Sequence, residues 1–168
     1  MTRVTVRRVE PDEWQTFRDI RLTALADAPS AYLTTLAEAQ AQPDQLWRDR
    51  IAENPHFLAF VDGTAVGMTV VIATDLGRHI VAVWVAPQAR GSGVIEALIE
   101  AAVDWSRAQG DTALGLFVVD GNERARRAYA RCGFQLSGRT QPVPGRPGEI
   151  ELEMTLPLTS VVDSDTPT

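Results

Sequence analysis

One segment near the middle of the chain constrains the fold more than any other. Residues 83–94 have the sequence Val-Trp-Val-Ala-Pro-Gln-Ala-Arg-Gly-Ser-Gly-Val. A β-branched run therefore ends at a proline and opens into a loop that holds two glycines. Beyond the loop, apolar residues recur at helical spacing, at Val94, Leu98, Ala101, Ala102 and Trp105. The pattern predicts a strand, a tight loop and a helix in direct succession.

The loop has the chemistry of an anion site. Gly91 and Gly93 carry no Cβ, so the backbone can turn sharply and approach a ligand closely. Backbone N–H groups would then gather at the positive end of a helix dipole. A Walker-type loop needs Lys and then Ser or Thr where Val94 and Ile95 stand, and a dinucleotide fingerprint needs glycine at Glu96. On this segment alone, an ordinary strand-to-helix turn stays open.

A second pattern follows further along the chain. Residues 122–134 have the sequence Asn-Glu-Arg-Ala-Arg-Arg-Ala-Tyr-Ala-Arg-Cys-Gly-Phe, directly after an apolar strand at 114–119. Positions 122, 125, 129 and 132 are three and four residues apart, so they share one face of a helix. Gly133 is suited to end that helix in a left-handed cap.

Together the two segments resemble the signatures of the GNAT superfamily of acetyltransferases. From Gln88 the chain has Gln-x-x-Gly-x-Gly after a Val-x-Val-x-Pro strand, similar to the family's pyrophosphate-binding motif. From Asn122 it has Asn-x-x-Ala-x-x-x-Tyr-x-x-x-Gly-Phe, similar to the second motif. Ile95 departs from the pattern, since many members carry another glycine there. Two motifs in the right order are much harder to obtain by chance than one.

The resemblance covers residues 3–156 and implies the GNAT fold. This is an α/β (α+β) fold with a mixed, mostly antiparallel sheet of six to seven strands and about four helices. The strand that enters the glycine loop and the strand at 113–119 are expected to be parallel neighbours that splay apart at a cleft. We expect one acetyltransferase domain over residues 1–158 and a flexible tail over 159–168.

The local patterns place the other elements. Alternation, helical periodicity and turn residues predict strands at 3–9, 56–61, 65–74, 78–86, 134–137 and 149–156, and helices at 11–25, 43–54, 92–109 and 122–132. We interpret 30–42 as a loop with a short helix and 139–148 as a loop.

The resemblance also implies which residues hold the cosubstrate acetyl-CoA. Backbone amides of the glycine loop would bind the pyrophosphate, and the edge of the preceding strand would pair with the pantetheine amides. Asn122 would bind the pantetheine arm, and Tyr129 would protonate the departing thiolate. The implied cofactor-binding residues are Val83, Trp84, Val85, Arg90, Gly91, Ser92, Gly93, Val94, Ile95, Asn122, Ala125 and Tyr129.

Each of these roles has a structural alternative. Tyr129 is also a plausible core residue, Arg90 a surface charge, and Asn122 a helix N-cap, although Asn122 can fill both roles. One or two of the arginines on the second-motif helix are expected to meet phosphates, and the others to be solvated; these are Arg124, Arg126, Arg127 and Arg131.

The base that would deprotonate the amine is poorly marked. His79 lies on the strand that enters the glycine loop, and an imidazole has an ordinary pKa near 6.5. Glu38, between the first two helices, is the other candidate. His79 could instead be a polar residue at the start of a strand, and Glu38 a solvated carboxylate. In many members of the family, ordered water takes the place of a base.

Composition excludes several classes of partner. The formal net charge is −6 and the pI is about 4.9, which argues against nucleic acid and anionic membranes. Cys132 is the only cysteine and there are two histidines, so we expect no intrachain disulfide and no metal site. With no apolar signal region or membrane-length run, we expect a cytoplasmic protein.

The predicted function is therefore N-acetyl transfer from acetyl-CoA to a primary amine by direct attack. A non-catalytic acyl-CoA binding or sensing module is the alternative. The acceptor, a small amine or a peptide amino group, would be chosen by residues 27–45 and 139–148. Carboxylates in or next to these segments (Asp27, Glu38, Asp44 and Glu149) favour a small cationic amine, unless they only keep the surface soluble. Both a monomer and a homodimer stay open.

Overall fold

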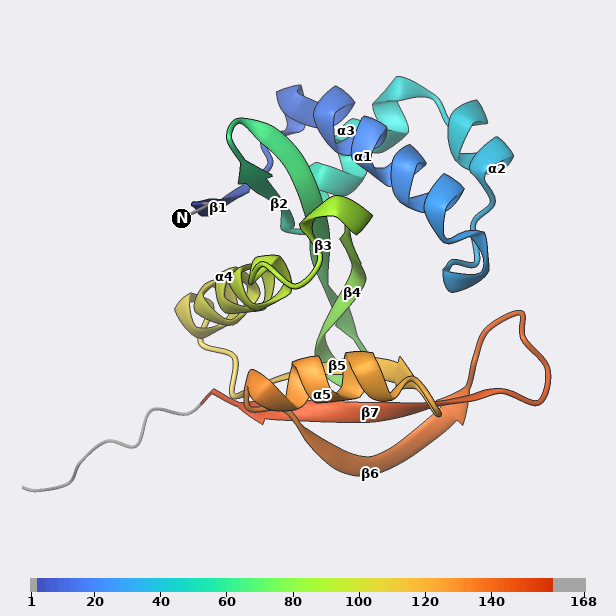
Figure 1. Ribbon diagram of the computed structural model, residues 1–168, viewed down its shortest axis with the longest axis vertical. Helices are drawn as coiled ribbons and strands as arrows, with labels where there is room; N and C mark the ends of the chain where they lie inside the picture. Colours follow the sequence, from blue (N-terminus) through green and yellow to red (C-terminus); the bar gives the residue numbers. More distant parts are fainter. Residues whose placement is uncertain (1–2, 159–168) are drawn as a thin grey trace, which may run out of the picture.

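A computed structural model describes residues 3–158, and the tail predicted at 159–168 lies outside this range (Figure 1). Seven strands form one sheet in the order β1-β2-β3-β4-β5-β7-β6. They are β1 (Val4–Arg8), β2 (His56–Val61), β3 (Thr64–Thr74), β4 (Gly77–Val85), β5 (Ala113–Val119), β6 (Gln135–Pro142) and β7 (Ile150–Pro157). The helices are α1 (Trp14–Asp27), α2 (Leu36–Ala41), α3 (Asp44–Glu53), α4 (Val94–Ala108) and α5 (Glu123–Arg131).

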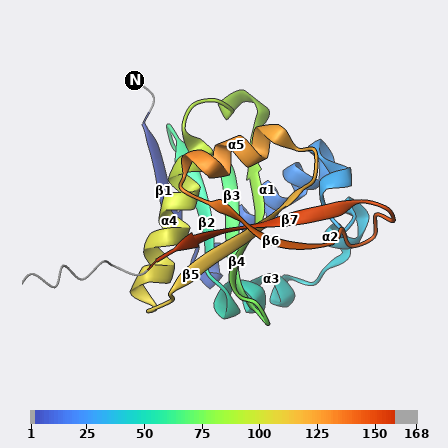
Figure 2. The same ribbon diagram turned by 90° about the horizontal axis from the view of Figure 1, so that it is seen from below.

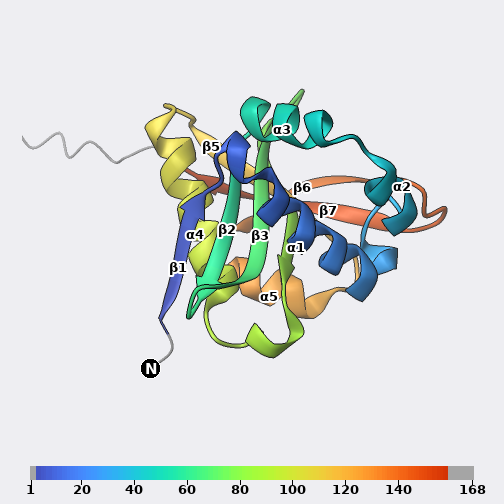
Figure 3. The same cartoon turned by 90° about the horizontal axis from the view of Figure 1, so that it is seen from above.

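Helices cover both faces of the first half of the sheet. Figure 3 shows α1 in front of β2–β4 and α4 behind them. Both bury apolar side chains against the sheet, among them Phe17 and Leu25 of α1 and Leu98 of α4. Gly67 of β3 lets α4 come close, because a Cβ there would lie 3.0 Å from a methyl carbon of Leu98 and 3.0 Å from one of Val94. The expected mixed, mostly antiparallel architecture is confirmed.

The sheet opens between β4 and β5, which are its only parallel neighbours among residues 3–158. Their pairing is limited to His79↔Gly115 and Ile80↔Leu116. Directly beyond Ile80, β4 carries a bulge. Val81 pairs with Val70 and Trp84 pairs with Met68, so two residues of β4 lie opposite one residue of β3. Ala82 in this bulge has a φ of 55°, a left-handed conformation that is uncommon for alanine. The bulge bends β4 away from β5, which produces the predicted splay.

The short helix expected within the loop at 30–42 is α2, whose start is fixed by a capping box between Thr35 and Glu38. The strand expected to end at Ser137 continues as β6 to Pro142, because it pairs with β7 beyond an irregularity after Leu136. Pro142 is tolerated there since β6 is an edge strand, with β7 as its one neighbour. Among residues 3–158, no helix is long and apolar enough to cross a membrane.

Candidate active site

A cleft of about 490 Å³ lies where β4 and β5 diverge, between the glycine loop, the start of α4 and one face of α5. All the residues predicted to hold acetyl-CoA line this cleft except Ser92. Sequence reasoning missed Ala28 and Ala31, which follow α1 and line one end of it. Small residues carry no chemical signal, and only the folded chain brings them to the glycine loop.

The glycine loop has the conformation that its sequence predicts. Gly91 and Gly93 have φ values of 78° and 84°, and no atom would lie within 4 Å of a Cβ at either position. Backbone conformation, rather than lack of space, therefore requires glycine there. The Ser92 hydroxyl donates to the carbonyl of Ala89 at 2.5 Å, so this side chain braces the turn. Ile95 sits in the first turn of α4 and lines the cleft without displacing the loop.

The end of β4 presents backbone groups that are not bonded to β3, and the carbonyl of Val85 accepts from Arg90 Nε at 3.1 Å. Val85 lies opposite Gly67, and the next amide, that of Ala86, donates to the carbonyl of Val66 at 2.7 Å. In an antiparallel ladder this places Val85 in a non-hydrogen-bonded pair, so its own N–H and C=O point away from β3. An extended amide ligand could pair with this edge as an added strand does.

The second motif places its polar residues on the cleft side of α5. Asn122 caps the helix, with its side-chain oxygen 3.2 Å from the amide of Ala125. Tyr129 is 8% exposed and lines the cleft, and burial raises its pKa to about 12. Its phenol therefore stays protonated at neutral pH and can act as a proton donor. Gly133, with a φ of 97°, follows the helix as the predicted left-handed cap.

The cleft is locally basic although the chain is acidic. Arg90, Arg124 and Arg131 line it, and Glu96 is the one carboxylate among its lining residues. Glu96 lies 3.6 Å from Arg131, across from α4 to α5. The two further arginines of α5, Arg126 and Arg127, are not among the lining residues. Excess positive charge in a concave site raises the local concentration of an anionic ligand such as a polyphosphate.

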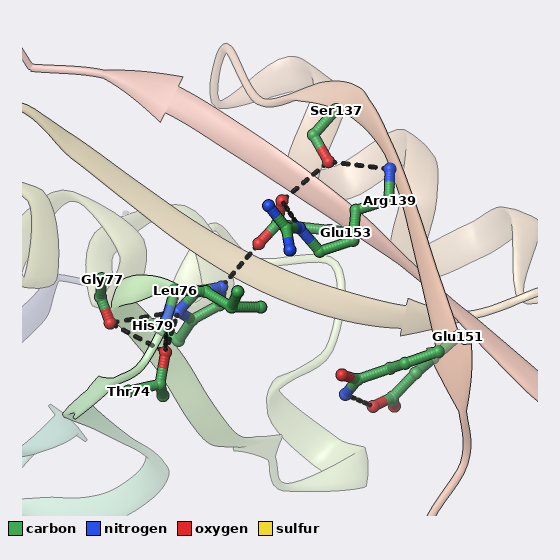
Figure 4. A network of polar contacts seen from close by, with 9 residues as sticks. Thr74, Leu76, Gly77, His79, Ser137, Arg139, Glu151 and Glu153 are labelled. Carbon is green, nitrogen blue, oxygen red and sulfur yellow. Dashed lines mark hydrogen bonds and ion pairs between the residues drawn. The ribbon is translucent and has the colours of Figure 1, made fainter.

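The candidate base His79 does not line this cleft. It is 3% exposed and faces a second cavity of about 390 Å³ at the other end of β4. Figure 4 shows its ring between Thr74 and Glu153, with 3.1 Å from Nδ1 to the Thr74 hydroxyl and 2.8 Å from Nε2 to the Glu153 carboxylate. Gly115 lies directly beneath the ring. His79 thus ties β4 to β5 and β7 where the strands begin to part.

Glu153 completes this network and was not predicted from the sequence. It alternates along β7 with apolar residues, as a solvent-facing residue would, yet it is 5% exposed. Burial alone would raise its pKa, but the hydrogen bonds from Ser137 and His79 lower it. Arg139 lies 3.5 Å from the same carboxylate.

The other candidate base, Glu38, serves α2. Its carboxylate accepts from the Thr35 amide at 2.9 Å, and its amide donates to the Thr35 hydroxyl at 3.2 Å. It does not line the cleft either. Neither candidate base is placed beside Tyr129, so the assignment of a base stays open.

The two segments expected to choose the acceptor lie side by side. Arg146, in the loop between β6 and β7, donates to the carbonyl of Ser30 after α1 at 3.3 Å. In the same place, a Cβ at Gly145 would lie 2.9 Å from a methyl carbon of Leu33. Figure 2 shows the β6–β7 loop reaching the α1–α2 region. Together these segments lie at the end of the cleft that Ala28 and Ala31 line.

The comparisons with known proteins agree with this geometry. The family model described as Acetyltransferase (GNAT) family matches residues 14–134. An acetyltransferase of the GNAT family from Streptococcus pneumoniae has a similar fold, with a TM-score of 0.76 and 16% identity over 94% of this chain and 100% of that one. A Salmonella typhimurium protein solved with its cofactor acetyl-CoA has a TM-score of 0.74 and 17% identity, over 98% of this chain and 99% of that one.

Nourseothricin acetyltransferase is more similar in sequence over a shorter stretch. It is 32% identical over 64% of this chain and 66% of its own, with a TM-score of 0.58. No protein with a curated description matches the chain. Since the family model spans the chain from α1 to the end of the second motif, and the fold agrees, this protein belongs to the GNAT family of acetyltransferases and is an acyltransferase of that type.

Proposed function

We propose that the protein transfers the acetyl group of acetyl-CoA to a primary amine by direct attack. The observation that carries this proposal is the meeting of four features around one cleft: the glycine loop, the edge of β4 at Val85 that does not pair with β3, the cap residue Asn122 and the buried Tyr129. A binding module without turnover would not need a protonated phenol at the end of its cleft.

The residues present fit acetyl-CoA. The loop amides and the arginines of the cleft match the charge of a pyrophosphate, and the edge of Val85 matches an extended amide chain. When bound, acetyl-CoA supplies an activated thioester. The amine nitrogen forms a bond to the carbonyl carbon, and the carbon–sulfur bond breaks. Tyr129 gives its proton to the thiolate sulfur and regains one from solvent. A protonated amine loses one proton to water before the attack and a second one after it.

We further propose a small cationic acceptor. Asp27 ends α1 and Glu149 directly follows the loop at 139–148, and carboxylates in these places attract a protonated amine. Each is paired with an arginine, Asp27 with Arg90 and Glu149 with Arg146, so the amine would have to displace that partner. The similarity to nourseothricin acetyltransferase gives one compound to test, beside amino acids, polyamines, aminoglycosides and peptide N-termini.

Cofactor binding can be tested without knowing the acceptor. CoA and acetyl-CoA should raise the melting temperature by mass action, and Gly91→Asp should abolish the rise by placing a carboxylate among the phosphates. Gly110→Asp is the matched control, because Gly110 has a φ of 82° at the opposite end of α4, with equal free space. It should lose as much stability yet still respond. A chain indifferent to CoA, or an unaltered response in Gly91→Asp, would refute the cofactor site.

Turnover tests the role of Tyr129. Tyr129→Phe should keep the Kd of CoA within a few-fold and lower kcat by about 10² or more, as for a lost general acid. The sequence contains no lysine, so acetylation of the enzyme's own lysines cannot contribute to thiol release. An unchanged kcat would mean that Tyr129 only packs in the core and is not the general acid. Binding of CoA without thiol release for any amine would favour the binding module.

A further inference from the structure

Arg90 and Asp27 form a bridge between the glycine loop and the end of α1. The Arg90 guanidinium donates from Nη2 to the Asp27 carboxylate at 2.9 Å and from Nε to the carbonyl of Val85 at 3.1 Å. The indole of Trp84 donates to the same Asp27 oxygen at 3.0 Å. The bridge therefore occupies the edge of β4 at Val85 and lies next to Ala28, which lines the cleft.

The bridge is made of groups that can exchange partners. The side chains of Arg90 and Asp27 are 40% and 28% exposed, so neither is locked in the core. Arg90 directly precedes Gly91 and uses two of its three guanidinium nitrogens in these bonds. A guanidinium binds phosphate oxygens in a bidentate manner, and a pyrophosphate in the glycine loop would lie next to it.

Asp27 would remain charged if Arg90 left. The hydrogen bond from Trp84 is the main cause that lowers its pKa, against the effect of burial, and Arg90 lowers it further. The indole would still hold one carboxylate oxygen in place. The carboxylate would then face the end of the cleft next to Ala28, which lines it.

We propose that Arg90 exchanges partners during the reaction: the phosphates of CoA draw its guanidinium from Asp27, and the freed carboxylate binds the ammonium group of the acceptor. This proposal rests on the proposed function, because it needs CoA in the cleft. It makes Asp27 a specificity-determining residue and Arg90 a positioning residue. Coupling between sites is reciprocal, so bound CoA should tighten acceptor binding and the acceptor should tighten CoA.

The exchange predicts an unusual result for Asp27→Asn. Removal of the competing carboxylate should tighten CoA binding by up to about fivefold, the range over which partly exposed ion pairs act. Arg90→Gln should weaken CoA binding, and adding Asp27→Asn to that variant should bring no gain. Calorimetric titration of CoA into the four proteins measures this cycle. Asp44→Asn, with the same change of net charge away from Arg90, is the control and should leave the Kd unchanged.

Kinetics with the best amine gives the second readout. Asp27→Asn should raise KM for a cationic amine more than it changes kcat, and a neutral amine should be affected less. Unchanged or weaker CoA binding in Asp27→Asn would overturn the exchange. So would a gain in CoA affinity of the same size when Asp27→Asn is added to Arg90→Gln, or in Asp44→Asn alone. If the unmodified protein fails to bind CoA, the proposed function falls and the exchange with it.

Discussion

Gly115 is the position at which a single methyl group should do the most damage outside the cleft. A Cβ there would lie 2.7 Å from Nε2 of His79 and 2.9 Å from its Cδ2, well inside contact distance. The ring cannot retreat freely, because Nε2 is 2.8 Å from the Glu153 carboxylate and the ring stacks on Phe117 at 5.4 Å. Overpacking costs about 1–3 kcal/mol, and losing a hydrogen bond to a charged group costs a similar amount. We expect Gly115→Ala to lower the free energy of unfolding by about 2–4 kcal/mol.

A double-mutant cycle separates this clash from a general effect of the substitution. Urea denaturation at pH 7 would compare Gly115→Ala in the original chain and in a His79→Ala background. Without the imidazole the methyl group has room, and alanine suits a strand better than glycine, so the cost there should fall below about 1 kcal/mol. Equal costs in both backgrounds would refute the argument. Since this pair sits where β4 and β5 part, Gly115→Ala should also weaken CoA binding from outside the cleft.

Two further predictions concern pH and salt. Burial lowers the pKa of His56 from 6.5 to about 4. Between these two pH values the unfolded chain binds a proton that the folded chain does not, so the free energy of unfolding decreases as the pH is lowered from about 6.5 to about 4. At 1.36 kcal/mol per pH unit the loss is about 3 kcal/mol. His56→Phe, which keeps a ring against Phe17, should flatten this acid limb in denaturation curves; an unchanged limb would assign it to other groups. For a cationic acceptor, kcat/KM should fall as ionic strength rises from low salt to physiological salt, where the Debye length has shrunk to about 8 Å, and a flat profile or an anionic best substrate would count against steering.

The features that the sequence predicted are those that depend on neighbouring residues. The glycine loop, the cap at Asn122 and the turn at Gly133 follow from local backbone chemistry, so short motifs carry them. The family resemblance then placed most of the cleft, including the unremarkable Ala125. The residues joined across the fold were beyond this kind of inference. Arg90 meets Asp27 from 63 positions away, and His79 meets Glu153 from 74 positions away.

The length of β6 was missed for a different reason. Almost all its side chains are exposed, so the strand shows no alternation of apolar and polar residues. Its pairing with β7 rests on backbone hydrogen bonds that any sequence can make. His79 was a candidate base because it is a histidine on the strand that enters the glycine loop. Only the folded sheet shows that Gly115 and Glu153 enclose its ring.

The bulge in β4 means that the cleft between β4 and β5 depends on one additional residue in that strand. Between Val81 and Trp84 this strand holds two residues where its partner β3 holds only Thr69. Deleting Ala82 would restore equal lengths, leave Trp84 opposite Met68 and keep the inner and outer faces of the strand in phase. A straightened β4 could then extend its ladder along β5 past Ile80 and fill the gap with backbone. We therefore expect the loss of one residue to close the cleft while the register of Trp84 on Met68 is kept.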